Sequence, residues 1–145
     1  MKDLLDGFFN FLNHSPTSWH AAKEISDRLV KANFKPLAED ESWSLEKGQG
    51  YFLVRDGSAI AAFRLPKKSL KRTILLASHL DSPALKLKPI AEVAGAGLIS
   101  QFFTELYGSP LLYTWLDRDL VLAGRIIVKT AQKKLETRLL FLEEH

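Results

Sequence analysis

Cysteine is absent from the 145 residues of this chain. The sequence can therefore form no disulfide and no thiolate metal site, and any metal ion must be bound by nitrogen or oxygen. Only four histidines are present to supply a nitrogen ligand. A chain without cysteine also suits a reducing compartment.

Long hydrophobic runs are absent as well. No segment approaches the length of about 20 apolar residues that a membrane-spanning helix needs. Residues 1–7 carry two acidic side chains and no apolar stretch of the kind found in signal peptides. We therefore expect no membrane partner and a cytoplasmic location.

The excess of positive charge is small. The 20 basic residues face 17 acidic ones, and the resulting net charge of +3 does not by itself indicate nucleic acid as a partner. A basic cluster at residues 67–72 contains no aromatic side chain that could stack on a base, so a solvated loop is the favoured interpretation. Only the pI near 9.2 and a β-rich second half favour a nucleic-acid-binding module, and we expect none.

The composition is that of a globular protein, with 46% hydrophobic and 26% charged residues. Apolar residues repeat at helical spacing over residues 4–12. Because the other face of this helix has few basic residues, we expect the helix to pack against the rest of the protein rather than on a membrane. A second helix is predicted to begin at Ser15 or Thr17, which can cap it, and to end before Pro36.

Two pairs of strands are predicted. Residues 51–55 and 58–64 flank the dipeptide Asp-Gly, which favours the positive φ values of a tight hairpin turn. Residues 120–129 and 135–142 flank a polar turn in the same way. Between these pairs, the composition changes beyond Pro89 to small and glycine-containing residues, which indicates a domain boundary there.

One further strand carries the candidate site. Residues 73–78 are almost wholly apolar, and their lack of alternation predicts a strand buried on both faces at the centre of a sheet. The strand ends at His79, with Asp81 two residues later. At the carboxyl end of such a strand, His79 can bind a divalent ion through one ring nitrogen while Asp81 accepts a hydrogen bond from the other. By itself His-x-Asp is a weak signal, since such a histidine is more often an ordinary loop residue.

Two other groups are weaker candidates. Asp117 and Asp119 could be metal ligands, but the intervening Arg118 is a ready partner, and an ion network at a turn is the favoured interpretation. His20 lies in the first turn of the second helix without an acidic neighbour in sequence. We therefore expect His20 to pack or to form a local hydrogen bond.

Several ordered blocks of this sequence resemble the amino-terminal portion of the aspartyl aminopeptidase family, whose members are dinuclear zinc metallopeptidases. Each block alone is weak evidence, and the assignment rests on their order along the chain. The blocks are Phe-Leu-Asn-His-Ser-Pro-Thr at 11–17 with His20, Trp-Ser-Leu-Glu-Lys-Gly at 43–48, Tyr-Phe-Leu-Val-Arg-Asp-Gly at 51–57, Ser-His-Leu-Asp-Ser-Pro at 78–83, Leu-Lys-Leu-Lys-Pro at 85–89, Tyr-Gly-Ser-Pro at 107–110, Thr-Trp-Leu-Asp-Arg-Asp-Leu at 114–120 and Ala-Gly-Arg at 123–125.

The resemblance implies an α/β fold. Residues 1–89 would form the amino-terminal part of a zinc-exopeptidase-like catalytic domain, with two helices, a β-hairpin and a central strand. Residues 90–145 would begin a β-rich inserted dimerisation domain. By the same resemblance His79 is a zinc ligand and Asp81 orients it. The implied activity is release of aspartate or glutamate from a peptide's amino terminus by water activated between two zinc ions, in homo-oligomers.

The family's remaining ligands and its general base have no counterpart in these 145 residues. One histidine and one orienting carboxylate cannot hold two zinc ions, so we expect the chain to be inactive alone. The favoured interpretation is a fragment or split product that a complementary carboxyl-terminal chain completes. The alternative is a non-catalytic protein, derived from this scaffold, that self-associates or binds a partner through the open edge of its central strand.

Overall fold

The computed structural model describes residues 2–93 and 101–142, which fall into two compact units. The first unit combines Met1–Leu80 with Val121–His145, and the second is Asp81–Leu120. The first unit mixes helices with strands, which confirms the predicted α/β class.

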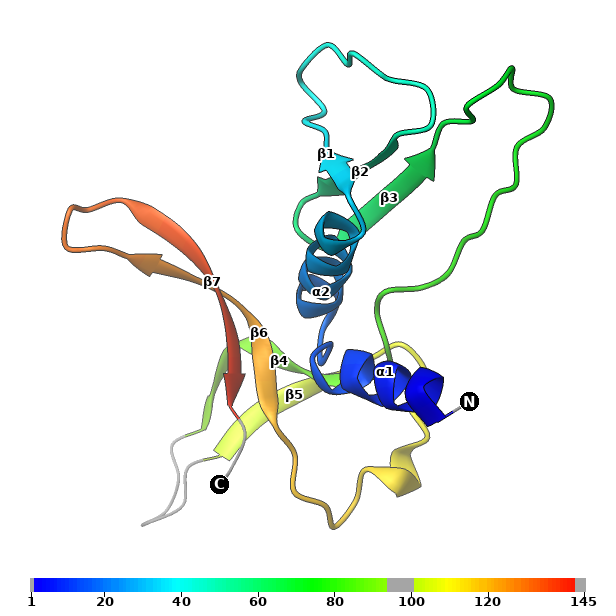
Figure 1. Ribbon diagram of the computed structural model, residues 1–145. Coiled ribbons are helices and arrows are strands. Elements are labelled where there is room, and N and C mark those ends of the chain that lie inside the picture. The colour runs from blue at the N-terminus through cyan, green and yellow to red at the C-terminus, as the bar shows by residue number, and fades with distance from the viewer. Residues whose placement is uncertain (1, 94–100, 143–145) are drawn as a thin grey trace. The chain divides into compact units, whose positions relative to one another are not determined.

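The two predicted helices are confirmed. Helix α1 spans Lys2–Asn13 and helix α2 spans Ser18–Lys31 (Figure 1). The side-chain oxygen of Thr17 accepts a hydrogen bond from the His20 N–H at 3.4 Å and so caps α2. After α2, Asn33 adopts a φ of 61°, in the left-handed region where helices commonly end.

A three-stranded sheet follows α2 in the chain. Strand β1 (Phe34–Pro36) pairs in parallel with β2 (Gly50–Arg55), which pairs in antiparallel with β3 (Ala59–Arg64). The predicted β2–β3 hairpin is confirmed, and Asp56 and Gly57 in its turn have φ values of 51° and 69°. The sequence did not predict β1, because three residues are too few to show a period.

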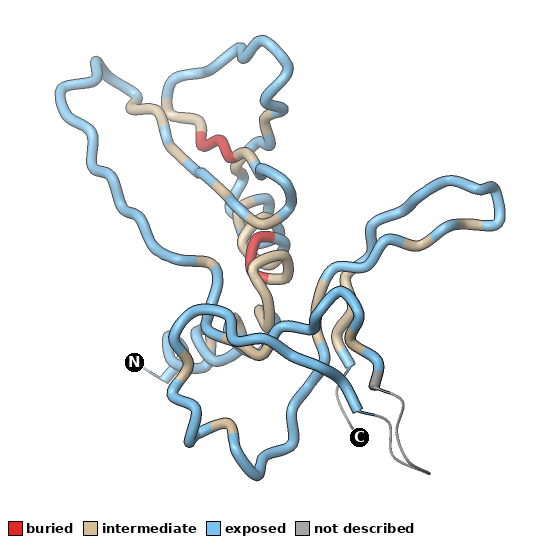
Figure 2. Tube along the Cα trace, turned by 180° about the vertical axis from the view of Figure 1, so that it is seen from behind, coloured by how far each residue is buried: buried red, intermediate tan, exposed pale blue. Residues whose placement is uncertain are grey.

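The core of the first unit lies between α2 and this sheet (Figure 1), and α2 contacts all three strands. Among the described residues, the buried hydrophobic side chains are Ala21 and Ala22 of α2 with Tyr51 and Phe52 of β2, in the segments coloured red in Figure 2. The two alanines let the helix approach the sheet closely. Because consecutive residues of a strand point to opposite faces of a sheet, Tyr51 and Phe52 lie on different faces, and the centre of the Tyr51 ring lies 5.7 Å from that of Phe63.

The second predicted strand pair is also confirmed. Strands β6 (Leu122–Lys129) and β7 (Leu135–Leu142) are antiparallel, and their register runs without a shift over the whole pair. The Thr130 N–H donates to the Lys134 carbonyl at 2.8 Å across the turn. Two strand-like segments on either side of a polar turn were sufficient to predict this hairpin.

The second unit contains a strand pair that the sequence did not predict. Strand β4 (Ala84–Val93) and β5 (Gln101–Tyr107) are antiparallel, and the 3-10 helix η1 (Leu112–Thr114) follows. Alternating leucine and lysine at residues 85–88 was the available signal. Strand β4 continues through Pro89, and part of the glycine-containing segment beyond it lies outside the described residues. Division into residues 1–89 and 90–145 therefore stays a prediction.

The predicted central strand at residues 73–78 is wrong. These residues have no strand conformation, and Ile74, Leu75 and Leu76 are 74%, 87% and 90% exposed. A strand buried on both faces needs hydrogen-bonding neighbours and covering layers. No other segment of the described chain pairs with these residues.

The expected packing of α1 is also not found. No described residue of α1 is buried, and Leu4, Phe8 and Phe9 are all more than half exposed. The helix is instead contacted by Arg28 of α2, whose guanidinium lies 5.2 Å from the centre of the Phe11 ring. Within residues 2–93 and 101–142, no helix is long and apolar enough to cross a membrane.

Candidate functional site

His79 lies in an exposed segment of irregular backbone in the first unit. The sequence placed it at the carboxyl end of a central strand, which the structure does not form. His79 therefore does not follow a strand. His79 is still chemically suited to bind a metal ion, because a neutral imidazole supplies one nitrogen ligand.

Asp81 lies in the second unit, three residues before the start of β4, and its carboxylate is bonded by a side chain that the sequence did not indicate. The Tyr107 hydroxyl, at the end of β5, donates a hydrogen bond to Oδ2 of Asp81 at 2.8 Å. This hydrogen bond and the charge of Asp81 raise the pKa of Tyr107 above its usual value. The phenol therefore stays a donor at neutral pH. Predicting Tyr107 as the partner of Asp81 from the sequence would have required knowing that β4 pairs with β5.

The described residues do not fit a complete zinc site. A structural or catalytic zinc ion takes three or four protein ligands, and two ions need more. Within residues 2–93 and 101–142, no group of three or more histidine, aspartate or glutamate side chains could hold a metal ion. His79 can contribute one ligand to such a site, and the others must come from elsewhere.

The turn at residues 117–119 also differs from expectation. Asp117 has a φ of 57°, so the backbone turns there as predicted. Across the described residues, however, no ion pair joins Arg118 to either flanking aspartate. Neither the ion network nor a metal site at this turn is therefore found.

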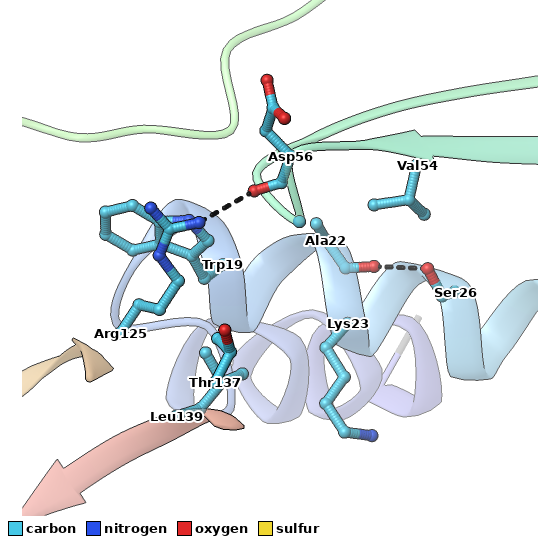
Figure 3. A pocket seen from close by; sticks show the side chains of 10 residues that line it. Trp19, Ala22, Lys23, Ser26, Val54, Asp56, Arg125, Thr137 and Leu139 are labelled. Atoms are coloured by element: carbon cyan, nitrogen blue, oxygen red, sulfur yellow. Dashed lines mark hydrogen bonds between the residues drawn. The ribbon is translucent and has the colours of Figure 1, made fainter. Parts of the chain in front are cut away.

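The first unit contains a pocket of about 340 Å³ that the sequence did not predict. In Figure 3, the Arg125 side chain of β6 crosses the indole of Trp19, with its guanidinium 5.0 Å from the ring, and donates to the Asp56 carbonyl at 3.4 Å. Val54 and Leu139 add apolar walls. The lining combines these apolar side chains with the charged residues Lys23, Asp56 and Arg125, a mixture that is typical of a binding pocket.

His20 forms the local contacts that the sequence predicted. Its Nδ1 lies 2.7 Å from the Thr17 hydroxyl, and its ring meets the Phe141 ring edge-on at 6.1 Å. Partial burial lowers the pKa of His20 below 6.5, because a charged imidazolium is poorly solvated there. His20 therefore belongs to the packing of the first unit.

The depressed pKa of His20 predicts loss of stability in acid. The unfolded chain binds a proton at pH 6.5 more readily than the folded chain, so stability is complete above that pH and falls as the pH drops toward the folded pKa. We expect His20→Gln to make the free energy of unfolding depend less on pH in this range. Urea unfolding of both proteins between pH 8 and 5 measures it. An NMR titration that gave His20 a pKa at or above 6.5 would contradict the prediction.

A family model described as aminopeptidase I zinc metalloprotease (M18) matches residues 11–144. A protein of Ricinus communis named probable aspartyl aminopeptidase is 41% identical over 122 residues, which are 83% of this chain and 25% of that protein. The chain thus spans about a quarter of the length of this curated relative.

Solved structures agree with this match over nearly the whole chain. A chain from the cryo-EM structure of the Ape4 and Nbr1 complex gives a TM-score of 0.88 at 34% identity, over 95% of this chain and 27% of that chain. The dodecamer of mApe1 from S. cerevisiae gives a TM-score of 0.80 at 28% identity, over 96% of this chain and 33% of that chain.

Proposed function

Because the chain belongs to the M18 family of aminopeptidase I zinc metalloproteases, we propose that it forms part of an enzyme that releases aspartate or glutamate from the amino terminus of peptides. The supporting observation is the 41% identity to a relative named as a probable aspartyl aminopeptidase. This enzyme would act in the cytoplasm and would bind neither nucleic acid nor a membrane.

Within this function, His79 is a zinc ligand and Asp81 the carboxylate that orients its ring. The support is chemical. Imidazole is a common zinc ligand, and a ligating histidine commonly donates its other ring N–H to a carboxylate. Because the described residues offer no group of three or more candidate ligands, the remaining ligands must come from residues outside this set.

It follows that the 145 residues should have no aminopeptidase activity by themselves. We expect no release of aspartate from an Asp-Ala dipeptide by the isolated chain, with or without added Zn²⁺ or Mn²⁺. Turnover above that of a His79→Ala variant would contradict the incomplete site.

A chimera tests the role of His79 in a complete enzyme. Residues 11–144 would replace the matching segment of the Ricinus communis relative, and the product should cleave Asp-Ala in preference to Leu-Ala. His79→Ala in the chimera should lower kcat/KM more than about 100-fold, beyond the usual effect of losing a partner outside the ligand set. His14→Ala is the matched control, because His14 is exposed at the end of α1. Equal loss in both variants would contradict the assignment.

A second candidate function is assembly without catalysis. It is favoured by exposed Ile74, Leu75 and Leu76 and by the exposed apolar face of α1, since surfaces of this kind promote association. One relative of known structure is a dodecamer. Light scattering should therefore detect self-association, or capture of a complementary carboxyl-terminal chain. A monomer at high concentration that also binds no such chain would exclude this candidate.

A further inference from the structure

The pocket of the first unit is built by elements that lie far apart in the sequence. Helix α2 contributes Trp19, Ala22, Lys23 and Ser26, whose spacing of three or four residues places them on one face of the helix. The β2–β3 and β6–β7 hairpins supply the other walls, and all the lining residues belong to this one unit (Figure 3). The volume of about 340 Å³ is near the lower limit of the roughly 300–1,000 Å³ of ligand pockets, so the pocket suits a small group.

The β6–β7 ladder sets a cation beside an apolar side chain in this pocket. Arg125 and Leu139 are direct partners in its register. Residues paired in this way point to the same face, with Cβ atoms about 4.5–5.5 Å apart. Because both side chains line the pocket, a ligand there meets a positive charge and an apolar surface within the span of one amino-acid residue.

The Arg125 guanidinium is oriented but not neutralised. It lies 5.0 Å from the Trp19 ring and donates one hydrogen bond, to the Asp56 carbonyl at 3.4 Å, while the Asp56 carboxylate points away from it (Figure 3). In the part of the chain that the structure describes, no carboxylate forms an ion pair with Arg125. Lys23, by contrast, is paired with Asp27 at 2.6 Å. Most N–H donors of the exposed Arg125 side chain can therefore serve a ligand.

We propose that this pocket binds the carboxyl terminus of a peptide that ends in an aliphatic residue. The guanidinium donates two parallel hydrogen bonds to the terminal carboxylate, a geometry that arginine favours. The aliphatic side chain packs against Leu139 and Val54. Carboxylate and side chain leave the same Cα of a terminal residue, which matches the adjacency of Arg125 and Leu139. The proposal involves neither a metal ion nor the second unit.

A free aliphatic amino acid carries the same carboxylate and side chain. Its ammonium group, however, would bring a second positive charge close to Arg125, and like charges at short range repel. The carboxyl end of a peptide has no such group, because its nitrogen is part of an amide. The charge of the pocket therefore favours the peptide end over the amino acid.

The test is an NMR titration of the ¹⁵N-labelled 145-residue chain with acetyl-Ala-Leu. We expect saturable shifts of the Trp19 indole N–H and the Arg125 side-chain N–H, with a Kd on the order of 1 mM for a ligand of this size. The indole signals of Trp43 and Trp115, which are not in the lining, should stay unchanged. The carboxyl-terminal amide of the same peptide should bind at least about tenfold more weakly, because it lacks the charged acceptor.

Arg125→Gln should weaken binding of acetyl-Ala-Leu at least about tenfold. Arg138→Gln is the matched control, because Arg138 lies on the same hairpin outside the pocket, paired with Glu136 at 3.1 Å, and its loss changes the net charge equally. Equal binding by these two variants would overturn the role of Arg125. If Arg125→Gln does not fold, the comparison of acid and amide on the unaltered chain still decides, since equal binding of the two excludes recognition of the carboxylate.

Two further outcomes would overturn the proposal. Free leucine that binds more tightly than acetyl-Ala-Leu would assign the pocket to an amino acid instead of a peptide end. No saturable shift of the Trp19 indole signal up to roughly 50 mM acetyl-Ala-Leu, well above the expected Kd, would show that the pocket does not bind this ligand.

Discussion

Replacing Tyr51 by alanine is expected to lower the free energy of unfolding of the first unit by about 3–5 kcal/mol, as for other large aromatic side chains removed from a core. Tyr51 is 2% exposed and is the largest of the fully buried side chains described. Its ring centre lies 5.7 Å from that of Phe63. Few other described side chains are fully buried, so few can move into the cavity that the alanine substitution would leave.

Urea unfolding followed by tryptophan fluorescence measures this loss. Tyr51→Phe is the matched control, because it keeps the ring and removes only the hydroxyl, which accepts a hydrogen bond from the Glu46 N–H at 2.7 Å. We expect that variant to lose about 1 kcal/mol. Equal stability of Tyr51→Ala and the unaltered chain would show that burial of the Tyr51 ring against Phe63 does not stabilise the unit.

Replacing Gly50 by alanine is expected to lower the stability of the first unit, because the added methyl group has no room. A Cβ at this position would lie 2.6 Å from Cδ1 of Phe34, its partner in the β1–β2 ladder. The Phe34 ring is confined on another side by the Arg64 guanidinium, 4.6 Å from the ring centre. Overpacking of this kind costs about 1–3 kcal/mol, more than the 0.4–1 kcal/mol or so that alanine contributes by restricting the unfolded chain.

The control for Gly50 is Gly124 in β6, where an added Cβ would meet nothing within 4 Å. Gly124→Ala should therefore leave the urea midpoint unchanged or raise it slightly. A second check is the double variant Phe34→Ala with Gly50→Ala, in which the alanine at position 50 should cost nothing further. A midpoint for Gly50→Ala equal to that for Gly124→Ala would contradict the predicted clash.

The success of the sequence-based predictions depended on how local the signal was. The β2–β3 hairpin follows from an Asp-Gly turn between apolar runs, and the start of α2 follows from the Thr17 cap, so both were predicted correctly. Burial is different, because it depends on what lies opposite. Residues 73–78 have the composition of a buried strand, but no described segment covers or pairs with them.

The candidate site divides along the same line. Its chemistry could be read from residue types, since His79 is a potential ligand and Asp81 a carboxylate two residues away. The contact that supports Asp81 could not be predicted from the sequence. Its partner is Tyr107, and the hydrogen bond between them depends on the β4–β5 register. The number of ligands likewise needed coordinates, since only distances show that no three candidate ligands in the described residues converge.

The sequence by itself determined the elements that form within a few residues, namely the two helices and the β2–β3 and β6–β7 hairpins, and its ordered blocks indicated the family. Tertiary structure alone decided which apolar segments are buried, which tyrosine reaches Asp81 and whether His79 sits at a strand end. The reason is physical. Turn and cap preferences are fixed by neighbouring residues, whereas burial and long-range hydrogen bonds depend on segments far apart in the chain that must meet before either can stabilise the fold.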